Sequence, residues 1–332
     1  MSVAQVAELP ADTVSTIEER TPFQIVMMRF RRHRLAMVSL ILMTAIFIIT
    51  IFAPVIAPFE VQELSVNKYF VPWGTVDEAT GRVHYLGTDH IGRDYFSRLI
   101  YAGRISLTVA LLSIFIAEVV GIVVGSISGF FGGWLDAVLM RFVEFMLTIP
   151  TLPLLLILSS MLLRNEELIP IPDVVLKFLG NIMLLSPRDA RNAVMIVLIL
   201  AGLGWLQSAQ LMRGMVLSLR EQTFVEASRS LGASNFRIIT RDMIPNAMAP
   251  IIVDASLGLA GFIVLEAALA FLGFGIQDPI PTWGNMLAAT QAHMLSRPWL
   301  PLVPGLPIFI CSLAFNYIGD GLRDALDPRL KL

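Results

Sequence analysis

Long charge-free apolar runs alternate with short polar segments along most of the 332-residue chain. An apolar helix of about 20 residues is long enough to span a bilayer. The pattern predicts six transmembrane helices, at about residues 35–57, 105–129, 143–163, 192–212, 247–275 and 298–319. The predicted fold class is therefore an all-α polytopic membrane protein, in which each spanning helix satisfies its own backbone hydrogen bonds.

An arginine-rich segment, Arg29-Phe-Arg-Arg-His-Arg34, directly precedes the first apolar run. Positive charge beside a first helix favours the cytoplasmic side, and six crossings return the C-terminus to that side. The remaining lysines and arginines are divided more evenly, so the orientation depends on this cluster. The predicted organisation is a cytoplasmic tail at 1–34 with 1–20 disordered, a first helix at 35–57, an extracytoplasmic loop at 58–102, a five-helix core at 103–320 that contains a polar loop at 219–246, and a cytoplasmic tail at 321–332.

Glycines and prolines predict details of the spans. Small residues recur at every fourth position of the second span, which permits close helix packing, with a role in gating as the alternative: Ser113, Ala117, Gly121, Gly125 and Gly129. We expect a tight turn at 129–141 and kinks at Pro150 and Pro153 in the third span. The apolar piece 174–185 is too short to span and is predicted to lie on the membrane surface. Repeated prolines suggest that the sixth helix begins only near Pro304.

Composition agrees with a membrane protein. Apolar residues make up 56% of the chain and charged residues 15%, against about 25% charged in soluble domains, and the mean hydropathy is +0.74. The single cysteine, Cys311, excludes an intrachain disulfide. A net charge of −2 gives no indication of a nucleic-acid partner.

The polar segment 221–250 separates the fourth and fifth spans. Thr223 and Glu226 have the spacing of a capping box at the start of a short helix. Gly232 is suited to ending that helix, Ser234 to capping a second one, and Pro245 to ending the second. Five arginines lie within or just before this helix–elbow–helix: Arg213, Arg220, Arg229, Arg237 and Arg241. Such an element suits docking onto another protein.

Motifs of catalysis are not found. None of the three lysines, Lys68, Lys177 and Lys331, follows a glycine, so the chain has no phosphate-binding P-loop. Neither an H-E-x-x-H nor a G-x-S-x-G sequence occurs. A group of four residues in the predicted outer loop imitates a metal site, but its spacing fits no standard pattern and favours a polar turn: His84, Asp89, His90 and Asp94. We therefore expect a non-catalytic chain without a cofactor.

Three acidic residues fall in the predicted spans: Glu118, Asp254 and Glu266. An acidic residue at the centre of a spanning helix costs about 2.5–3.5 kcal/mol and usually faces protein or water. Asp254 and Glu266 are candidates for a translocation path. A buried hydrogen bond that pins two helices is an equal alternative for Glu266 and the preferred interpretation for Glu118.

Several segments together resemble a known family. Glu226-Ala-Ser228, Gly232 and Met243-Ile-Pro245 resemble the EAA loop of permease subunits of binding-protein-dependent ABC importers, with Ser228 in place of the usual alanine. Six further segments narrow the resemblance to the C-type permease of the dipeptide/oligopeptide branch, over about residues 21–332: 29–37, 86–94, 130–134, 271–275, 283–286 and 319–329. A long 164–191 loop and the extra prolines Pro301 and Pro307 depart from the family pattern.

The resemblance implies a type I importer permease fold in a prokaryotic inner or plasma membrane. The elbow would be the coupling helix that sits in a cleft of an ATPase subunit, with Glu226, Ala227, Ser228, Gly232 and Pro245 as its coupling residues. The implied partners are a second homologous permease, two ATPase subunits that carry ATP and Mg²⁺, and an extracytoplasmic solute-binding protein. Transport would occur by alternating access.

Peptides are the expected cargo, and oligosaccharides or nickel remain open. An ion-coupled secondary transporter that uses Asp254 and Glu266 is the main rival from another class, and an intramembrane enzyme is a third. Corresponding broken helices in the two halves, which would favour the secondary transporter, are not evident. The absence of nucleophile and metal-ligand patterns disfavours the enzyme.

Overall fold

The computed structural model describes residues 21–65, 68–165 and 169–327. The predicted disorder of residues 1–20 and the last five residues of the predicted C-terminal tail fall outside this range. The helices and strands are α1 (Pro22–Arg32), α2 (Arg34–Ile51), α3 (Ala53–Ile56), β1 (Thr75–Val76), β2 (Val83–His84), α4 (Tyr95–Phe131), α5 (Gly133–Thr148), α6 (Thr151–Arg164), α7 (Asp173–Met183), α8 (Pro187–Arg220), α9 (Thr223–Ser230), α10 (Asn235–Arg237), a π-helical turn (Ile238–Met243), α11 (Ile244–Phe271), α12 (Trp283–Ala289), a 3-10 turn (Gln291–His293) and α13 (Leu302–Leu326).

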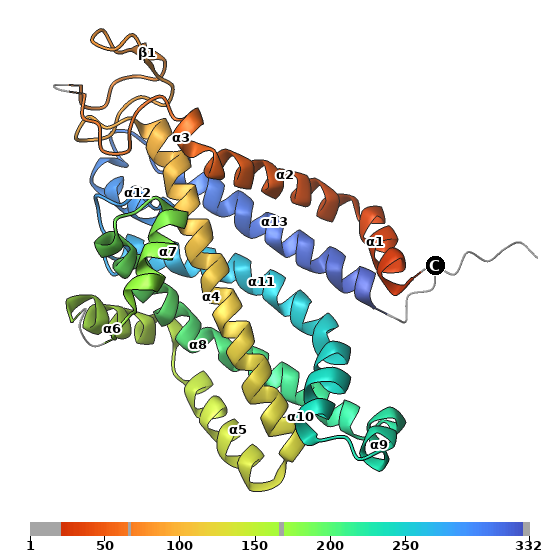
Figure 1. Cartoon of the computed structure of the whole chain (residues 1–332). Coiled ribbons are helices and arrows are strands. Elements are labelled where there is room, and N and C mark those ends of the chain that lie inside the picture. The colour runs from red at the N-terminus through yellow and green to blue at the C-terminus, as the bar shows by residue number, and fades with distance from the viewer. Residues whose placement is uncertain (1–20, 66–67, 166–168, 328–332) are drawn as a thin grey trace, which may run out of the picture.

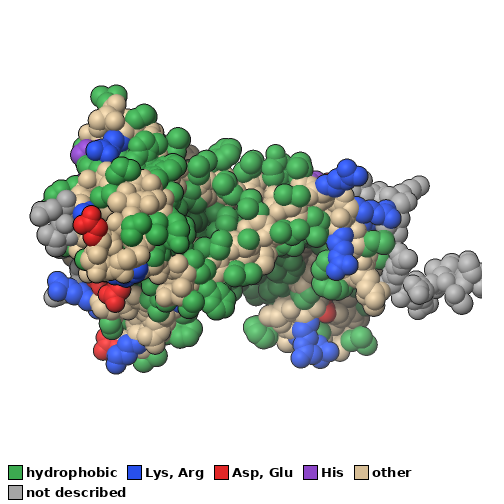
Figure 2. All heavy atoms as spheres, turned by 90° about the horizontal axis from the view of Figure 1, so that it is seen from above, with side chains coloured by type: hydrophobic (Ala, Val, Ile, Leu, Met, Phe, Trp, Pro, Cys, Tyr) green, Lys and Arg blue, Asp and Glu red, His purple; other side chains and the backbone are tan. Residues whose placement is uncertain are grey.

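The long helices form a bundle in which α2, α13, α11 and α4 lie side by side, and α8 packs along α4 (Figure 1). Five helices in the described part of the chain are long and apolar enough to cross a membrane, and α5 with α6 makes a sixth if this pair, bent by 93°, is counted as one span. The predicted class of polytopic helical membrane protein is thus confirmed. Hydrophobic side chains cover the middle of the face in Figure 2, while Lys and Arg gather towards its two ends.

The two ends of the bundle are distinct in Figure 1. We call the end that carries α9, α10 and the π-helical turn, residues 223–243, the elbow end. The opposite end, formed by residues 58–94 and 272–300, is called the loop end. Among the described residues the one sheet is the short pair of strands β1 and β2, paired as Thr75–His84 and Val76–Val83.

The stripe of small residues on α4 packs directly against α8. A Cβ atom added to Gly121 would lie 2.5 Å from Ser208 Cβ, and one added to Gly125 would lie 2.8 Å from Met212 Cβ. At Gly129 the added atom would lie 2.9 Å from the Arg213 carbonyl oxygen. Close approach of the two backbones therefore depends on these glycines, as the packing interpretation predicted.

Helix α4 is longer at its start than the predicted second span. It begins at Tyr95, inside the stretch 58–102 that was predicted as loop, because the Asp94 side chain caps it by accepting a 2.7 Å hydrogen bond from the Ser97 N–H. Polar and charged residues in the first turns of α4 made this part of the helix resemble a loop in the sequence.

The predicted turn at 129–141 is also wrong, since helix continues on both sides of Gly132 and Gly133. These two glycines alone make the turn, with φ of +65° and +58°.

Prolines break the third span at one position only. Pro150 separates α5 from α6 and produces the 93° bend. The kink predicted at Pro153 is absent, because this residue lies in the first turn of α6, where backbone N–H groups have no intrahelical partner in any case.

Both ends of the chain are more helical than predicted. Helix α13 begins at Leu302 and runs to Leu326, so the stretch from 321 onward is not simply a tail. Helix α1 occupies part of the predicted N-terminal tail, and its capping box joins Thr21 and Gln24. Arg29 Nη1 donates a 2.7 Å hydrogen bond to the Asp327 carbonyl oxygen, which holds α1 against the end of α13.

Helix α7 corresponds to the short apolar piece predicted at 174–185. Its buried face, which includes Leu176 and Leu179, packs on α8. Val174 and Phe178 are exposed on the opposite face. Apolar side chains thus lie on both faces of α7, and its place on the membrane surface stays a prediction.

Candidate functional site

The elbow begins one residue earlier than its sequence suggests. Gln222 is the N-cap of α9, with extended backbone angles, and makes no side-chain cap bond. Thr223 is already helical, and the N–H of Glu226 donates to the Gln222 carbonyl oxygen at 3.3 Å. The predicted capping box of Thr223 and Glu226 is therefore wrong, and the Glu226 side chain is left exposed at the surface.

One face of α9 anchors the elbow and the other faces out. Val225 is fully buried against Met212, Val216 and other apolar side chains beneath it. Glu226 and Ala227 are exposed and Ser228 is half-buried. At the apex, Leu231 is 88% exposed and Phe236 is 77% exposed. Exposed apolar side chains grouped at one place mark an interaction surface.

The turn of the elbow has the predicted geometry. Gly232 has a φ of +79°, in the left-handed region that side chains disfavour. The Ala233 N–H donates to the Ser228 carbonyl oxygen at 3.1 Å and closes the helix end. Ser234 Oγ then accepts a 3.4 Å hydrogen bond from the Arg237 N–H and caps the next helix, as expected.

Pro245 does not end the second helix, contrary to prediction. The chain is helical without interruption from Asn235 to Phe271, and the turn Ile238–Met243 is π-helical. The Ile244 N–H donates to the carbonyl oxygen of Ile239, five residues earlier. A proline ring clashes with the carbonyl four residues before it, and the widened turn accommodates this ring. Pro245 therefore joins the elbow to α11.

The arginines near the elbow divide into two groups. Arg213 donates hydrogen bonds of 2.5 and 2.7 Å to the Asp136 carboxylate of α5. Arg229 lies over the Phe130 ring, 5.4 Å from its centroid. Arg237 and Arg241 are exposed at the elbow surface. The first group holds the base of the elbow to the α4–α5 turn, and the second is available to a partner.

A pocket of about 550 Å³ lies between α4, α8, α11 and the break between α5 and α6. Glu118 and Asp254 both line it. Ser208 Oγ donates a 3.0 Å hydrogen bond to Asp254 Oδ2. Neither carboxylate oxygen of Glu118 has a hydrogen-bond partner within the described residues, so the helix-pinning bond predicted for Glu118 is not formed.

Glu266 lies elsewhere in the bundle. Its side chain is 1% exposed, and its Oε2 accepts a 3.2 Å hydrogen bond from Ser106 of α4. Ser106 in turn accepts a 3.1 Å hydrogen bond from the Trp283 N–H at the start of α12. The structure therefore places Glu266 against protein and does not bring it together with Asp254. Its contacts join three helices.

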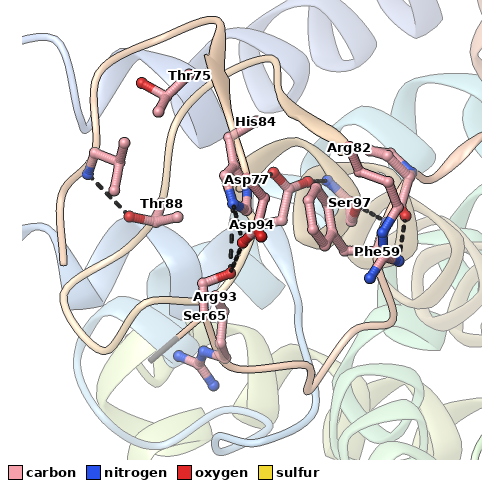
Figure 3. A network of polar contacts seen from close by, with 12 residues as sticks. Phe59, Ser65, Thr75, Asp77, Arg82, His84, Thr88, Arg93, Asp94 and Ser97 are labelled. Atoms are coloured by element: carbon pink, nitrogen blue, oxygen red, sulfur yellow. Dashed lines mark hydrogen bonds and ion pairs between the residues drawn. The ribbon is translucent and has the colours of Figure 1, made fainter. Parts of the chain in front are cut away.

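A buried polar network organises the loop end (Figure 3). The ring of His84 lies between Asp94, 2.8 Å from its Nδ1, and Asp77, 3.7 Å from its Nε2. Phe59 stacks on the imidazole with centroids 4.2 Å apart. Burial opposes ionisation of Asp77, but the N–H groups of Ala79 and Thr80 and the Lys68 ammonium outweigh it and hold the pKa of this carboxyl well below its usual range.

A second network joins the loop end to the start of α4. Asp89 accepts hydrogen bonds from the backbone N–H and the Nε of Arg93, at 2.9 and 2.7 Å. Arg93 and Arg98 both bind Asp278, which follows α11. His90 stacks on His293 with centroids 6.1 Å apart. Of the four residues that imitated a metal site, only His84 and Asp94 contact each other, and no cluster of three metal-binding side chains occurs among the described residues.

Sequence reasoning missed Asp278 and the pocket role of Glu118. Asp278 lies in a polar loop, and its arginine partners are 180 and 185 residues away in the chain. Glu118 was recognised as a membrane acid, but its lack of a partner follows only from the packing of four helices.

Comparison with known proteins agrees with this architecture. A family model described as the binding-protein-dependent transport system inner membrane component matches residues 121–332. A second model, the N-terminal transmembrane domain of oligopeptide transport permease C, matches residues 21–72. The two models together cover α1, α2 and the bundle from the middle of α4 onward.

Similar proteins match over nearly their whole length. The dipeptide transport system permease protein of Alkalihalophilus pseudofirmus is 35% identical over 314 residues, covering 94% of this chain and 91% of that protein. The oligopeptide transport system permease protein of Mycobacterium bovis is 33% identical, with 92% and 94% covered. The glutathione transport system permease protein of Pectobacterium atrosepticum is 31% identical, with 99% and 97% covered. This chain therefore belongs to the family of inner-membrane permease components of binding-protein-dependent transport systems.

Proposed function

We propose that this chain is a translocation subunit of an ATP-driven importer that takes up di- or oligopeptides. The names of its relatives support the cargo, since those proteins are dipeptide, oligopeptide and glutathione permeases. The observation that carries the proposal is the elbow. A chain without a P-loop presents an anchored short helix with an exposed outer face and two exposed apolar side chains, Leu231 and Phe236.

ATPase subunits dock on the elbow in this proposal, with Glu226, Ala227 and Ser228 in the groove of the partner. Small side chains at 227 and 228 permit close approach, and Arg237 and Arg241 offer charge to an acidic rim. Gly232 and Pro245 fix the direction of α9 relative to α11. The elbow end then faces the cytoplasm, and both termini lie on that side.

The remaining partners follow from the family. A second permease completes the membrane unit, two ATPases bind Mg²⁺ and hydrolyse ATP, and an extracytoplasmic binding protein delivers cargo to the loop end. Closure of the ATPases on ATP favours one facing state of the helices, and a ligand shifts such an equilibrium only by its differential affinity for the two states. The pocket lined by Asp254 supports a path at this place in the bundle, whereas the contacts of Glu266 support helix packing.

Transport by reconstituted vesicles tests the proposal. The complete complex is placed in proteoliposomes with ATP enclosed on the side of the elbow, and uptake of a labelled dipeptide is measured with the binding protein outside. We expect uptake that requires ATP. The substitution Ala227→Arg, in the docking face, should abolish uptake and ATPase co-purification, while Ala79→Arg, at the opposite end of the bundle, should leave ATPase co-purification unchanged. Uptake that continues without ATP and collapses with an ion gradient would contradict the proposal.

A further inference from the structure

The pocket between α4, α8 and α11 contains two carboxylates and no compensating positive charge. Glu118 and Asp254 line it, and no Lys, Arg or His is among the described residues around it. The other polar groups at its wall are the Ser208 hydroxyl and the Gln207 amide. In an apolar surrounding a carboxylate is costly unless a cation or hydrogen-bond donors balance it.

Glu118 is the described residue for which both carboxylate oxygens are buried without a hydrogen-bond partner. Its side chain is only 7% exposed, and neither of its oxygens is hydrogen-bonded within the described part of the chain. Asp254, by contrast, is half-buried and bound to Ser208 through one oxygen. A molecule that enters the pocket with N–H or O–H donors can therefore satisfy this buried acceptor pair.

The walls suit an organic cation better than a bare metal ion. Most of the lining is aliphatic or aromatic and includes Ile114, Leu257 and Phe262. The volume of about 550 Å³ falls within the range of small-molecule pockets, about 300–1,000 Å³. Apolar walls also strengthen the attraction between a carboxylate and a cation, because they exclude water.

We propose that this pocket binds the ammonium group of a peptide as the peptide crosses the membrane. This inference rests on the proposed function as a peptide importer. An ammonium group has three N–H donors, which Glu118, Asp254 and the Ser208 hydroxyl oxygen can accept. The side chain next to the peptide amino terminus then lies on the apolar wall. The permease therefore selects for a free amino terminus, independently of the binding protein.

The site can be tested without transport by placing a cysteine in the pocket and comparing how fast cationic and anionic reagents modify it. The native Cys311 is replaced by alanine, and Gln207→Cys provides one reactive thiol in the complete reconstituted complex. Rates of modification by the cationic 2-aminoethyl and the anionic 2-sulfonatoethyl methanethiosulfonates are compared. We expect the cation to react faster, and the ratio of the two rates to fall about fivefold in E118Q and in D254N. The matched control E144Q, on α5 outside this pocket, should leave the ratio unchanged.

Protection by ligands distinguishes an ammonium site from a merely negative pocket. Alanyl-alanine amide, which carries the ammonium group and no carboxylate, should slow modification of the introduced cysteine. N-acetyl-alanyl-alanine amide, which lacks the charge, should not. Equal effects of the two compounds, or a rate ratio that does not respond to E118Q, would overturn the inference. If Gln207→Cys does not assemble, Leu257→Cys probes the same pocket.

The results distinguish a wrong ammonium site from a wrong assignment as an importer. ATP-dependent uptake of a dipeptide with unchanged rate ratios in E118Q and D254N would refute the ammonium site and leave the importer intact. Charge selectivity and protection without ATP-dependent uptake would refute the importer and leave a cation site.

Discussion

Arg98 Nη2 donates a 2.7 Å hydrogen bond to Asp278 Oδ1, although the two residues are 180 positions apart in the chain. Arg93 Nη1 donates to the other oxygen of the same carboxylate at 2.8 Å. One acidic side chain therefore holds the start of α4 to the segment that follows α11. Burial alone would raise the pKa of Asp278, but the two guanidinium groups outweigh burial and hold its pKa below the usual range.

Removal of this carboxylate should loosen the loop end. We expect Asp278→Asn to destabilise residues 86–98 by about 1–3 kcal/mol, less than a fully buried pair, because Asp278 is half exposed. Hydrogen–deuterium exchange of these residues measures the effect. Glu78→Gln, an exposed acid in the same outer loop, is the matched control and should change nothing. Equal exchange in the two variants would contradict the role of Asp278.

The same carboxylate gives a pH dependence with a definite sign. Its pKa is lower in the folded protein than the value of about 3.9 expected for an unfolded chain. Its contribution to stability is therefore complete above about pH 4 and is lost as the pH falls further, through the folded-state pKa. Wild-type protein should show smaller protection factors at the loop end below about pH 4, with exchange compared with the intrinsic rate at each pH, and D278N should show a weaker change over that interval.

Replacing glycine by alanine in the elbow and in the helix before it should change stability in opposite directions. A Cβ atom added to Gly232 or to Gly214 meets no atom within 4 Å, so space does not distinguish them. Gly232→Ala forces a side chain into a left-handed conformation, which costs about 1–2 kcal/mol. Gly214→Ala lies inside α8 and should stabilise the helix by about 1 kcal/mol. Exchange rates of α9 amides check the first variant, and those of α8 amides check the second.

Gly232→Val should further weaken ATPase co-purification while membrane insertion continues. Unchanged co-purification and unchanged substrate-stimulated hydrolysis in Gly232→Val would argue against the coupling role of the elbow.

Packing of α4 on α8 should not tolerate a larger residue at the centre of the stripe. Gly125→Val would place side-chain atoms against Met212 and the backbone of α8, and overpacking of this kind typically costs about 1–3 kcal/mol. The measurement is the apparent melting temperature in detergent. Gly202→Val, on α8 but with open space around its Cβ position, is the control and should shift melting much less. A larger shift for Gly202→Val would show that the stripe is not the packing contact.

Asp94 has two roles that can be separated by substitution. Its Oδ2 caps α4 by accepting from Ser97, and its Oδ1 contacts His84. Asp94→Ala removes both and should cost more than the 0.5–2 kcal/mol of a cap alone. Asp94→Ser keeps a capping hydroxyl but is too short to keep the histidine contact, so it should fall between Ala and wild type. Protease resistance of the loop end orders the three proteins, and equal resistance of the Ala and Ser variants would show that the cap contributes nothing.

Sequence alone predicted the class of fold, the elbow and its left-handed glycine, because each rests on short-range patterns. It misplaced the start of α4, where Asp94 caps a turn that reads as loop, and it expected Pro245 to end a helix that a π-helical turn continues. It could not find the pairing of Asp278 with Arg93 and Arg98, since that contact depends on how distant segments fold together. The unpaired state of Glu118 was hidden for the same reason.

The uninterrupted helix from Asn235 to Phe271 has a mechanical consequence. At about 1.5 Å per residue its contour is on the order of 55 Å long. The π-helical turn at Ile238–Met243 and Pro250 lie in its first half, and features of this kind bend helices, so the elbow segment runs at an angle to the rest of α11 (Figure 1). A force on the elbow is therefore passed through a bent but continuous helix first to the surroundings of Asp254 and then to those of Glu266.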